Sequence, residues 1–243
     1  MTDLPTAAIL IIGDEILSGR TRDANMHHLA GQLTEKGIKL CEVRVITDEH
    51  DRIKHTVAEL SKAYTHLFTS GGIGPTHDDI TAEAIADAFD DPIDIRDDAR
   101  EILRAHYDRS GLELTAARLR MARIPDSASL IENPVSAAPG FTLGNVHVMA
   151  GVPSVFQAMV ASLLPQLTGG APMLSESLRV ILPESEIAEP LGAIAAKYPE
   201  LSFGSYPFIT NGVFGANIVA RGTDPETLAK GVSNLRAVFA DSA

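Results

Sequence analysis

Residues 7–12 form a continuous apolar run, Ala-Ala-Ile-Leu-Ile-Ile, which ends at Gly13. Successive side chains of a strand point to opposite faces of a sheet, so a strand that is apolar at every position is covered on both faces. Such a strand cannot lie at an exposed edge. We therefore expect residues 7–12 to be a central strand with helices packed on both sides.

The next segments alternate between helical and strand patterns. Residues 24–36 carry apolar side chains at helical spacing before Gly37, and residues 38–46 alternate apolar and polar side chains like a half-covered strand. The alternation continues with a helix around residues 53–60, a strand at residues 66–69 and a helix that ends near Phe89. This β-α-β-α-β-α order predicts an α/β fold with a mostly parallel, doubly wound sheet.

The remainder of this domain has weaker signals. Residues 97–123 resemble two helices broken at Ser110-Gly111, and two short strands, 140–143 and 146–149, flank the hairpin signal Gly144-Asn145. A helix is expected from about residue 153 to residue 167. The sequence Gly-Gly-Ala-Pro at 169–172 has the composition of a linker, so we place the domain boundary there, with a first domain of residues 1–170.

Residues 171–243 predict a smaller α+β domain with a one-sided sheet. Its order is β-α-β-β-α: a strand at 178–182, a helix at 184–197, a hairpin of 201–208 and 213–221 around Asn211-Gly212, and a helix at 225–239. The aromatic residues Tyr198, Phe203, Tyr206 and Phe208 are expected in its core. The domain has no cluster of titratable groups, which favours a role in packing or dimerisation.

Charge and cysteine content exclude several classes of protein. The 32 acidic and 20 basic residues give a formal net charge of -12, which opposes binding to nucleic acid. The basic-leaning stretch 96–123 also contains Asp and Glu, and we interpret it as a solvated helical surface.

The single cysteine, Cys41, excludes an intramolecular disulfide and is expected to be buried in its strand. The N-terminal apolar run is too short to span a membrane, so we expect a cytoplasmic protein.

Three polar turns follow the predicted parallel strands. They are Gly13-Asp14-Glu15, Thr47-Asp48, and the glycine-rich segment 70–79. Ligands of open parallel sheets bind at the carboxyl ends of the strands, where these turns should meet. The glycines allow close approach to an anion, and a divalent cation would reconcile a phosphate with the neighbouring carboxylates. The alternative is that Asp78 or Asp79 only caps a helix and that the glycines only make a turn.

Five short motifs occur in order along the chain. They are Ile-Gly-Asp-Glu-Ile-Leu-Ser-Gly at 12–19, Asp-x-Asn at 23–25, Gly-Gly-Ile-Gly-Pro-Thr-x-Asp-Asp-x-Thr at 71–81, Ala-Pro-Gly-Phe at 138–141 and Gly-Val-Pro at 151–153. Together they resemble the molybdopterin-binding (MoaB/Mog-like) domain of the CinA (competence/damage-inducible protein A) family. The resemblance covers residues 7–167, and the segment from residue 178 resembles the small domain that follows in that family. The nicotinamide-nucleotide amidase domain of longer CinA proteins has no counterpart here, so deamidation of nicotinamide mononucleotide is not expected.

The resemblance implies a choice of chemistry. Mog-type domains adenylate molybdopterin, whereas CinA-type domains are associated with metal-dependent hydrolysis of ADP-ribose, and the similar domain of FAD synthases with hydrolysis of FAD. The Gly-Pro-Thr-x-Asp-Asp loop at 74–79 resembles the CinA type. We therefore favour a metal-dependent nucleotide pyrophosphatase. The alternatives are a molybdopterin-binding or molybdopterin-adenylating protein and a non-catalytic nucleotide-binding module.

The resemblance also implies roles for individual residues. The phosphate- or nucleotide-binding residues would be Gly13, Asn25, Gly71, Gly72, Gly74, Thr76, Ser136, Pro139 and Gly140. The catalytic residues would be Asp14, Glu15, Asp78 and Asp79, and the metal ligands Asp14, Asp48 and Asp78. The cation would be Mg²⁺, Mn²⁺ or Co²⁺, with K⁺ as a further candidate. The expected ligand is a small phosphorylated nucleotide or a pterin, and the expected assembly is a homo-oligomer.

Overall fold

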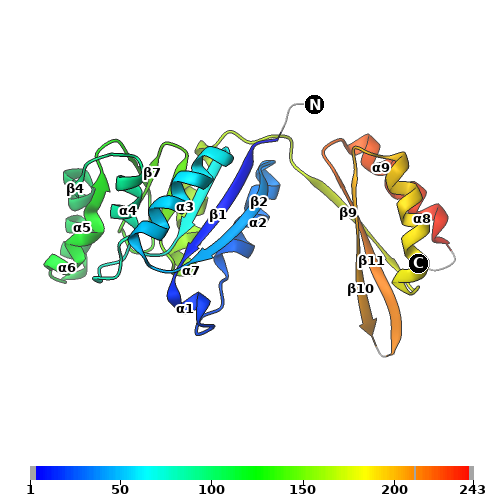
Figure 1. The fold of residues 1–243 in the computed structure, drawn as a ribbon, viewed down its shortest axis with the longest axis horizontal. Coiled ribbons are helices and arrows are strands. Elements are labelled where there is room, and N and C mark those ends of the chain that lie inside the picture. Colours follow the sequence, from blue (N-terminus) through cyan, green and yellow to red (C-terminus); the bar gives the residue numbers. More distant parts are fainter. Residues whose placement is uncertain (1–3, 211, 241–243) are drawn as a thin grey trace. The chain divides into compact units, whose positions relative to one another are not determined.

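The structure is a computed structural model that describes residues 4–210 and 212–240 (Figure 1). The chain forms two compact units, Met1–Gly170 and Ala171–Ala243. Within the described residues, every helix is too short or too polar to cross a bilayer.

The first unit is built on a six-stranded sheet with the order β2-β1-β3-β8-β7-β6. Strands β2, β1, β3 and β8 are parallel, β7 is antiparallel to β8, and β6 is antiparallel to β7. The predicted mostly parallel sheet is therefore confirmed. The bounds are β1 Thr6–Ile12, β2 Lys39–Ile46, β3 His66–Ser70, β6 Ser129–Ile131, β7 Gly140–Leu143 and β8 Val146–Met149.

Helices cover both faces of this sheet, as the apolar run in β1 requires. Ala8, Leu10 and Ile12 are buried with residues of α3 (His50–Ala63), α4 (Thr81–Ala88) and α5 (Asp97–Ser110). Ala7, Ile9 and Ile11 are buried on the other face with residues of α2 (Asn25–Lys36) and α7 (Pro153–Leu163), which ends in the 3-10 turn η2 (Leu164–Gln166) (Figure 1). Because the side chains of β1 alternate between two separate cores, the strand is central and the sheet is doubly wound.

The order of the strands creates a switch point beside β1. The chain leaves β1 for β2 on one side and then returns to β3 on the other side. The connections from β1 and β3 therefore diverge at their carboxyl ends, where doubly wound sheets bind ligands. A one-turn helix, α1 (Asp14–Leu17), follows β1 at this point.

Residues 97–125 differ from the prediction of two helices. Helix α5 ends at Gly111, which has a positive φ of 66°, as expected of a glycine after a helix. The chain then forms only a short helix α6 (Ala116–Leu119) and a 3-10 turn η1 (Arg120–Ala122). It enters the strand β5 (Arg123–Pro125), which pairs with β4 (Ile93–Ile95). This long-range strand pairing overrides the local helical pattern.

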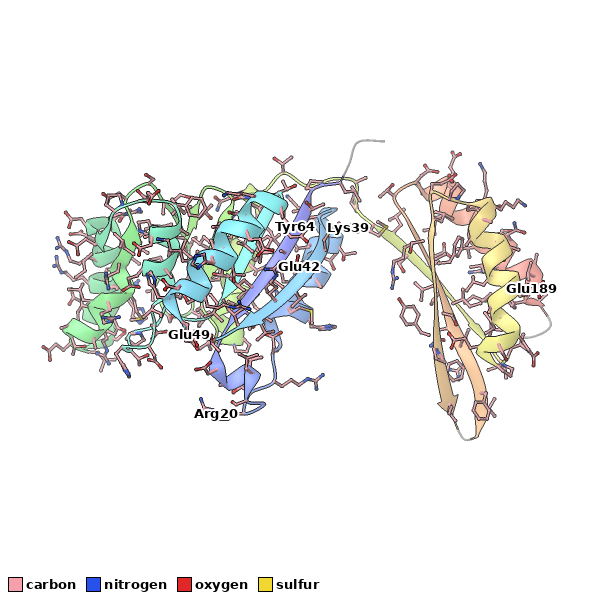
Figure 2. The ribbon with its side chains drawn as sticks, viewed as in Figure 1. Arg20, Lys39, Glu42, Glu49, Tyr64 and Glu189 are labelled. Carbon is pink, nitrogen blue, oxygen red and sulfur yellow. The ribbon has the colours of Figure 1, made fainter. Side chains whose placement is uncertain are left out.

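Strand β2 is an edge strand whose polar side chains have partners. The hydroxyl of Tyr64 donates to Glu42 at 2.6 Å, and Figure 2 shows these two residues together. This hydrogen bond and the Arg44 guanidinium lower the pKa of Glu42. Cys41 is exposed, so its predicted burial is wrong. The register between β1 and β2 shifts at this point and pairs Leu40 and Glu42 with consecutive residues of β1, so Cys41 is an extra residue without a partner in the register.

The second unit has a three-stranded antiparallel sheet with the order β10-β11-β9. Its elements are β9 Leu174–Val180, α8 Glu184–Lys197, β10 Ser202–Thr210, β11 Val213–Gly222 and α9 Pro225–Val238, which confirms a small α+β fold. Tyr198 and Phe203 pack against its core, but Tyr206 is 47% exposed and accepts a hydrogen bond from Arg221. The prediction of Tyr206 as core is therefore wrong. Asn211 of the predicted hairpin turn lies outside the described residues.

Candidate functional site

The turns after β1 and β2 are joined directly. The backbone amide of Gly13 donates to the carbonyl of Ile46 at 3.2 Å. The amide of Asp14 donates to Asp48 Oδ2 at 3.0 Å. The Asp14 side chain itself is exposed. These bonds hold the two strand ends together and fix one carboxylate oxygen of Asp48 in the turn.

The glycine-rich loop after β3, residues 71–79, passes very close to β1; we call it the glycine loop. Gly71 and Gly72 have φ values of 112° and 70°, in a region that side chains disfavour. A Cβ at Gly71 would lie 2.2 Å from the carbonyl oxygen of Ile12, and a Cβ at Gly72 would lie 2.0 Å from Thr81 Oγ1. The amide of Thr81, the first residue of α4, donates to the carbonyl of Gly72 at 3.0 Å. Glycine is therefore needed at both positions for the loop to pack between β1 and α4.

The two aspartates of this loop share one threonine. The amide of Thr76 donates to Asp79 Oδ2 at 2.8 Å. The hydroxyl of Thr76 lies 2.5 Å from Asp78 Oδ1 and 2.6 Å from Asp79 Oδ2. The hydroxyl bond lowers the pKa of Asp78, because it stabilises the ionised carboxylate. Thr76 therefore organises the two carboxylates.

The loops enclose a cavity of about 530 Å³, which we call the large cavity. It lies within the size range of small-molecule sites. The predicted site residues that line it are Glu15, Asp48, Gly71, Gly72, Gly74, Asp78, Asp79 and Ser136. Further lining residues that the sequence did not single out include Thr21, Met121 and Asn133. The residues of all three strand-end turns thus meet around one space.

The other predicted residues lie outside this lining. Gly13, Asp14 and Thr76 are in the surrounding turns, Pro139 lines a neighbouring cavity, and Gly140 is buried at the start of β7. Asn25 is buried and donates from Nδ2 to Ser70 Oγ and to the carbonyl of Gly151, both at 2.8 Å. Asn25 therefore joins α2 to the ends of β3 and β8 and contributes to the site indirectly, by holding these strand ends in place.

Asn133 has a signal in the sequence that we did not use. It precedes Pro134, and its Oδ1 accepts hydrogen bonds from the amides of Val135 and Ser136, while its Nδ2 donates to Ser136 Oγ and to the carbonyl of Ala138. Asn-Pro pairs favour such turns. Asn133 thereby shapes the loop that presents Ser136 to the large cavity.

The large cavity is strongly acidic. Burial raises the pKa of Asp48, the amide of Asp14 lowers it, and the charges of Asp14, Glu15 and Asp78 raise it again. Repulsion among several carboxylates is relieved when a cation binds among them. Carboxylate oxygens are also the donors that Mg²⁺ prefers. The chemistry of the donor set therefore fits a hard cation.

The predicted metal ligands nevertheless do not form a complete metal site. Among the described residues, no group of three or more His, Cys, Asp or Glu side chains is arranged to hold a metal ion. Mg²⁺ is commonly held by one or two carboxylates together with phosphate oxygens of a substrate. Of the three predicted ligands, only Asp48 and Asp78 line the large cavity, so a cation there would need further donors such as phosphate oxygens.

Two arginines that the sequence analysis did not single out lie next to the site. Arg120 and Arg123 line a small cavity of about 20 Å³ next to the glycine loop. Their side chains are 35% and 29% exposed, and both approach Glu83. The interpretation of residues 96–123 as a solvated surface is therefore wrong for this part. The strand β5 draws the segment back against the loop, which no local pattern reveals.

Family models match both units. One described as a probable molybdopterin binding domain matches residues 8–169, and one described as the FAD synthase middle domain matches residues 172–243. A probable FAD synthase of Caenorhabditis elegans is 33% identical over 265 residues, which cover 99% of this chain and 51% of the relative. A protein of Aeropyrum pernix is 32% identical over 216 residues, which cover 85% of this chain and 81% of the relative.

The chain spans about half the length of the Caenorhabditis relatives and 63% of the length of a protein of Metallosphaera sedula. A solved structure of CinA from Thermoplasma acidophilum, a protein with unknown function, matches with a TM-score of 0.61 and 33% identity. That match covers 66% of this chain and 98% of the solved one. The chain therefore belongs to the CinA-like proteins whose N-terminal domain has the molybdopterin-binding, MoaB/Mog-like fold.

Proposed function

We propose that the first unit binds a nucleotide that contains a phosphoanhydride, such as ADP-ribose or FAD, and hydrolyses it with a divalent cation. The observation that carries this proposal is the large cavity, where backbone of the glycine loop and the carboxylates of Glu15, Asp48, Asp78 and Asp79 face one space of about 530 Å³. The names of the relatives as probable FAD synthases support a flavin or adenine nucleotide as ligand.

The glycine loop would hold the phosphates. Gly71, Gly72 and Gly74 have no side chains to block an anion, and the loop leads into the N-terminus of α4, where backbone N–H groups favour negative charge. The lining of the cavity also includes Ile12, Val152 and Val155, which offer apolar surface to a base or a flavin ring. The cavity therefore suits a ligand with one planar and one phosphorylated part.

Asp48 and Asp78 would hold the cation, with Asp14 beside them. When bound, the cation supplies charge neutralisation at the phosphoryl oxygens and acidifies a water molecule. The Glu15 carboxylate has no hydrogen-bond partner among the described residues, so it is free to accept a proton from the attacking water. The water oxygen would bond to one phosphorus as the bridging P–O bond breaks, and the second phosphate would leave with the bridging oxygen.

A second candidate is molybdopterin binding or adenylation, which the description of the matching family model favours. The same loop would then position a pterin phosphate and ATP. A third candidate is a binding module without turnover. The three candidates differ in products, so one set of incubations separates them.

Incubation of the protein with ADP-ribose, FAD or ATP, each with Mg²⁺, Mn²⁺ or Co²⁺, tests the proposal. Release of AMP from ADP-ribose or FAD is the expected result. Turnover that requires both molybdopterin and ATP would support the second candidate, and binding without products would support the third. Either of these two results contradicts hydrolysis of the phosphoanhydride.

Substitution of Asp78 tests the role of the carboxylates. Asp78→Asn should lower kcat on the order of 100-fold, because a neutral amide binds a cation poorly. Stability should change by less than about 0.5 kcal/mol, because the side chain is exposed. Asp108→Asn, an exposed substitution on α5 away from both cavities, is the matched control. Equal rates in Asp78→Asn and the wild type would remove Asp78 from the mechanism.

A further inference from the structure

Arg120 lies in a small cavity that shares part of its lining with the large cavity. Arg120 lines the small cavity, and the two cavities share five lining residues: Gly72, Ile73, Gly74, Asp79 and Met121. Two of these five residues carry no side chain. The guanidinium therefore lies behind a wall that both cavities share, made of the backbone of the two glycines and of the side chains of Ile73, Asp79 and Met121.

The guanidinium of Arg120 is only weakly engaged. Its Nη2 lies 3.5 Å from the carbonyl oxygen of Asp79 and 3.9 Å from Glu83 Oε1, which are long contacts for a charged donor. Its Nε is buried and has no hydrogen-bond partner. A buried donor without a partner is costly. Arg120 thus retains donors and positive charge that the protein itself does not neutralise.

The neighbouring arginines differ from Arg120 in this respect. Arg123 forms a close ion pair with Glu83. Arg96 binds both carboxylate oxygens of Asp98 at 2.8 Å and donates to the carbonyls of Pro125 and Ala128. These two side chains are explained by the contacts that they make within the fold. Arg120 is not.

The charge balance of the large cavity indicates what Arg120 is for. The described residues that line it include four carboxylates and no lysine or arginine. A pyrophosphate bound there would meet negative charge on several sides, and one divalent cation compensates only part of it. Opposite charges attract at short range, so a cation behind the loop favours an anion in front of it, with partial screening because the Arg120 side chain is 35% exposed.

We propose that Arg120 is a positioning and specificity residue that favours ligands with a pyrophosphate over ligands without phosphate. Its charge acts through the backbone of residues 72–74 and through the Asp79 carbonyl, without forming part of the lining of the large cavity. This inference rests on the proposed function, because it assumes that the large cavity takes a phosphorylated nucleotide.

Binding of a ligand that cannot be hydrolysed tests this role without turnover. Calorimetry on the full chain with Mg²⁺ would compare α,β-methylene-ADP, which keeps two linked phosphates, with adenosine, which has none. Arg120→Gln should weaken binding of α,β-methylene-ADP about tenfold, equivalent to about 1.4 kcal/mol, and leave binding of adenosine unchanged. Arg120→Lys, which keeps the charge, should restore most of the affinity, and the loss in Arg120→Gln should shrink as salt is raised.

Arg118→Gln is the matched control. It removes one positive charge from the same segment, but Arg118 stacks on Tyr107 and donates to the carbonyl of Glu113, and it lines neither cavity. Its affinities should equal those of the wild type. Equal binding of α,β-methylene-ADP by Arg120→Gln and the wild type would overturn the role of Arg120 alone. Equal losses in Arg120→Lys and Arg120→Gln, or parallel losses for adenosine, would show a structural role and overturn it too. A wild type that binds neither compound would overturn both this inference and the proposed function.

Discussion

Polar groups have different surroundings at the two ends of strand β3. At the amino end, His66 Nδ1 lies 3.1 Å from His147 Nε2, and His147 Nδ1 lies 3.0 Å from Thr142 Oγ1. At the carboxyl end, the chain turns into Gly71 and Gly72 with positive φ. The polar groups at the amino end satisfy one another, whereas those at the carboxyl end face a cavity.

This difference separates structural from functional polarity. A buried polar group that is fully paired adds to stability and makes a fold more specific. Carboxylates that raise one another's pKa, as at Asp48, cost stability unless something else binds there. Substitutions at the amino end of the sheet should therefore lower the free energy of unfolding and leave ligand binding unchanged. Substitutions at the carboxyl end should change ligand binding.

The largest effect should come from Gly71→Ala. The new Cβ would lie 2.2 Å from the carbonyl oxygen of Ile12, at a φ of 112°. Backbone cannot move aside as a side chain can, so we expect a loss of about 3 kcal/mol in the free energy of unfolding together with loss of ligand binding. Urea denaturation and calorimetry with α,β-methylene-ADP would measure both.

Gly19→Ala is the control for this substitution. Gly19 also has a positive φ, 72°, but a Cβ there would meet nothing within 4 Å. It should cost about 1 kcal/mol from backbone strain alone. Equal losses at Gly71 and Gly19 would mean that the contact between the glycine loop and β1 contributes nothing beyond strain.

The architecture was predictable from local patterns that long-range contacts reinforce. The apolar run 7–12 required two covered faces, and both faces of β1 are indeed buried in separate cores. The glycines at 71 and 72 indicated a close approach of backbone. In these segments, the side-chain period and the tertiary environment favour the same structure, so the sequence alone is informative.

The arginines beside the site were not predictable in this way. Arg120 and Arg123 follow a short helix in a segment with helical and charged character, and only the pairing of β5 with β4 brings them to the glycine loop. Cys41 and Tyr206 show the same limit. Each lies on a strand, but exposure depends on long-range structure: the register between β1 and β2 skips Cys41, and Tyr206 lies on a strand whose covered face is set by other segments.

The amino end of β3 should give the fold a dependence on pH. Burial, and next the charge of His66, lower the pKa of His147 from 6.5 to about 3. Between these pH values, His147 is therefore protonated in the unfolded chain and neutral in the folded chain. The contribution of His147 to the free energy of unfolding is complete above pH 6.5 and falls by about 1.4 kcal/mol per pH unit below it, a loss of roughly 2 kcal/mol at pH 5.

Urea denaturation of the wild type and of His147→Gln between pH 5 and pH 7.5 would isolate this contribution. Carboxylates with lowered pKa also lose stability in acid, so the difference between the two proteins is the relevant quantity. The wild type should lose about 2 kcal/mol more than His147→Gln on acidification to pH 5. Parallel pH profiles would show that His147 is not held neutral in the folded chain.

The smallest effect is expected at Asn145, in the turn between β7 and β8 at this same amino end. Its Nδ2 donates to the carbonyls of Ser61 and Tyr64 at 2.8 Å and 2.9 Å, which ties the turn to the end of α3. Asn145→Ala removes both donors without placing a charge against the carbonyls, and it should cost about 1 kcal/mol, because water can reach these partly exposed carbonyls. Affinity for α,β-methylene-ADP should not change. A loss of affinity without a loss of stability would mean that the two ends of the sheet are coupled, and that paired polar groups at the amino end serve the ligand as well as the fold.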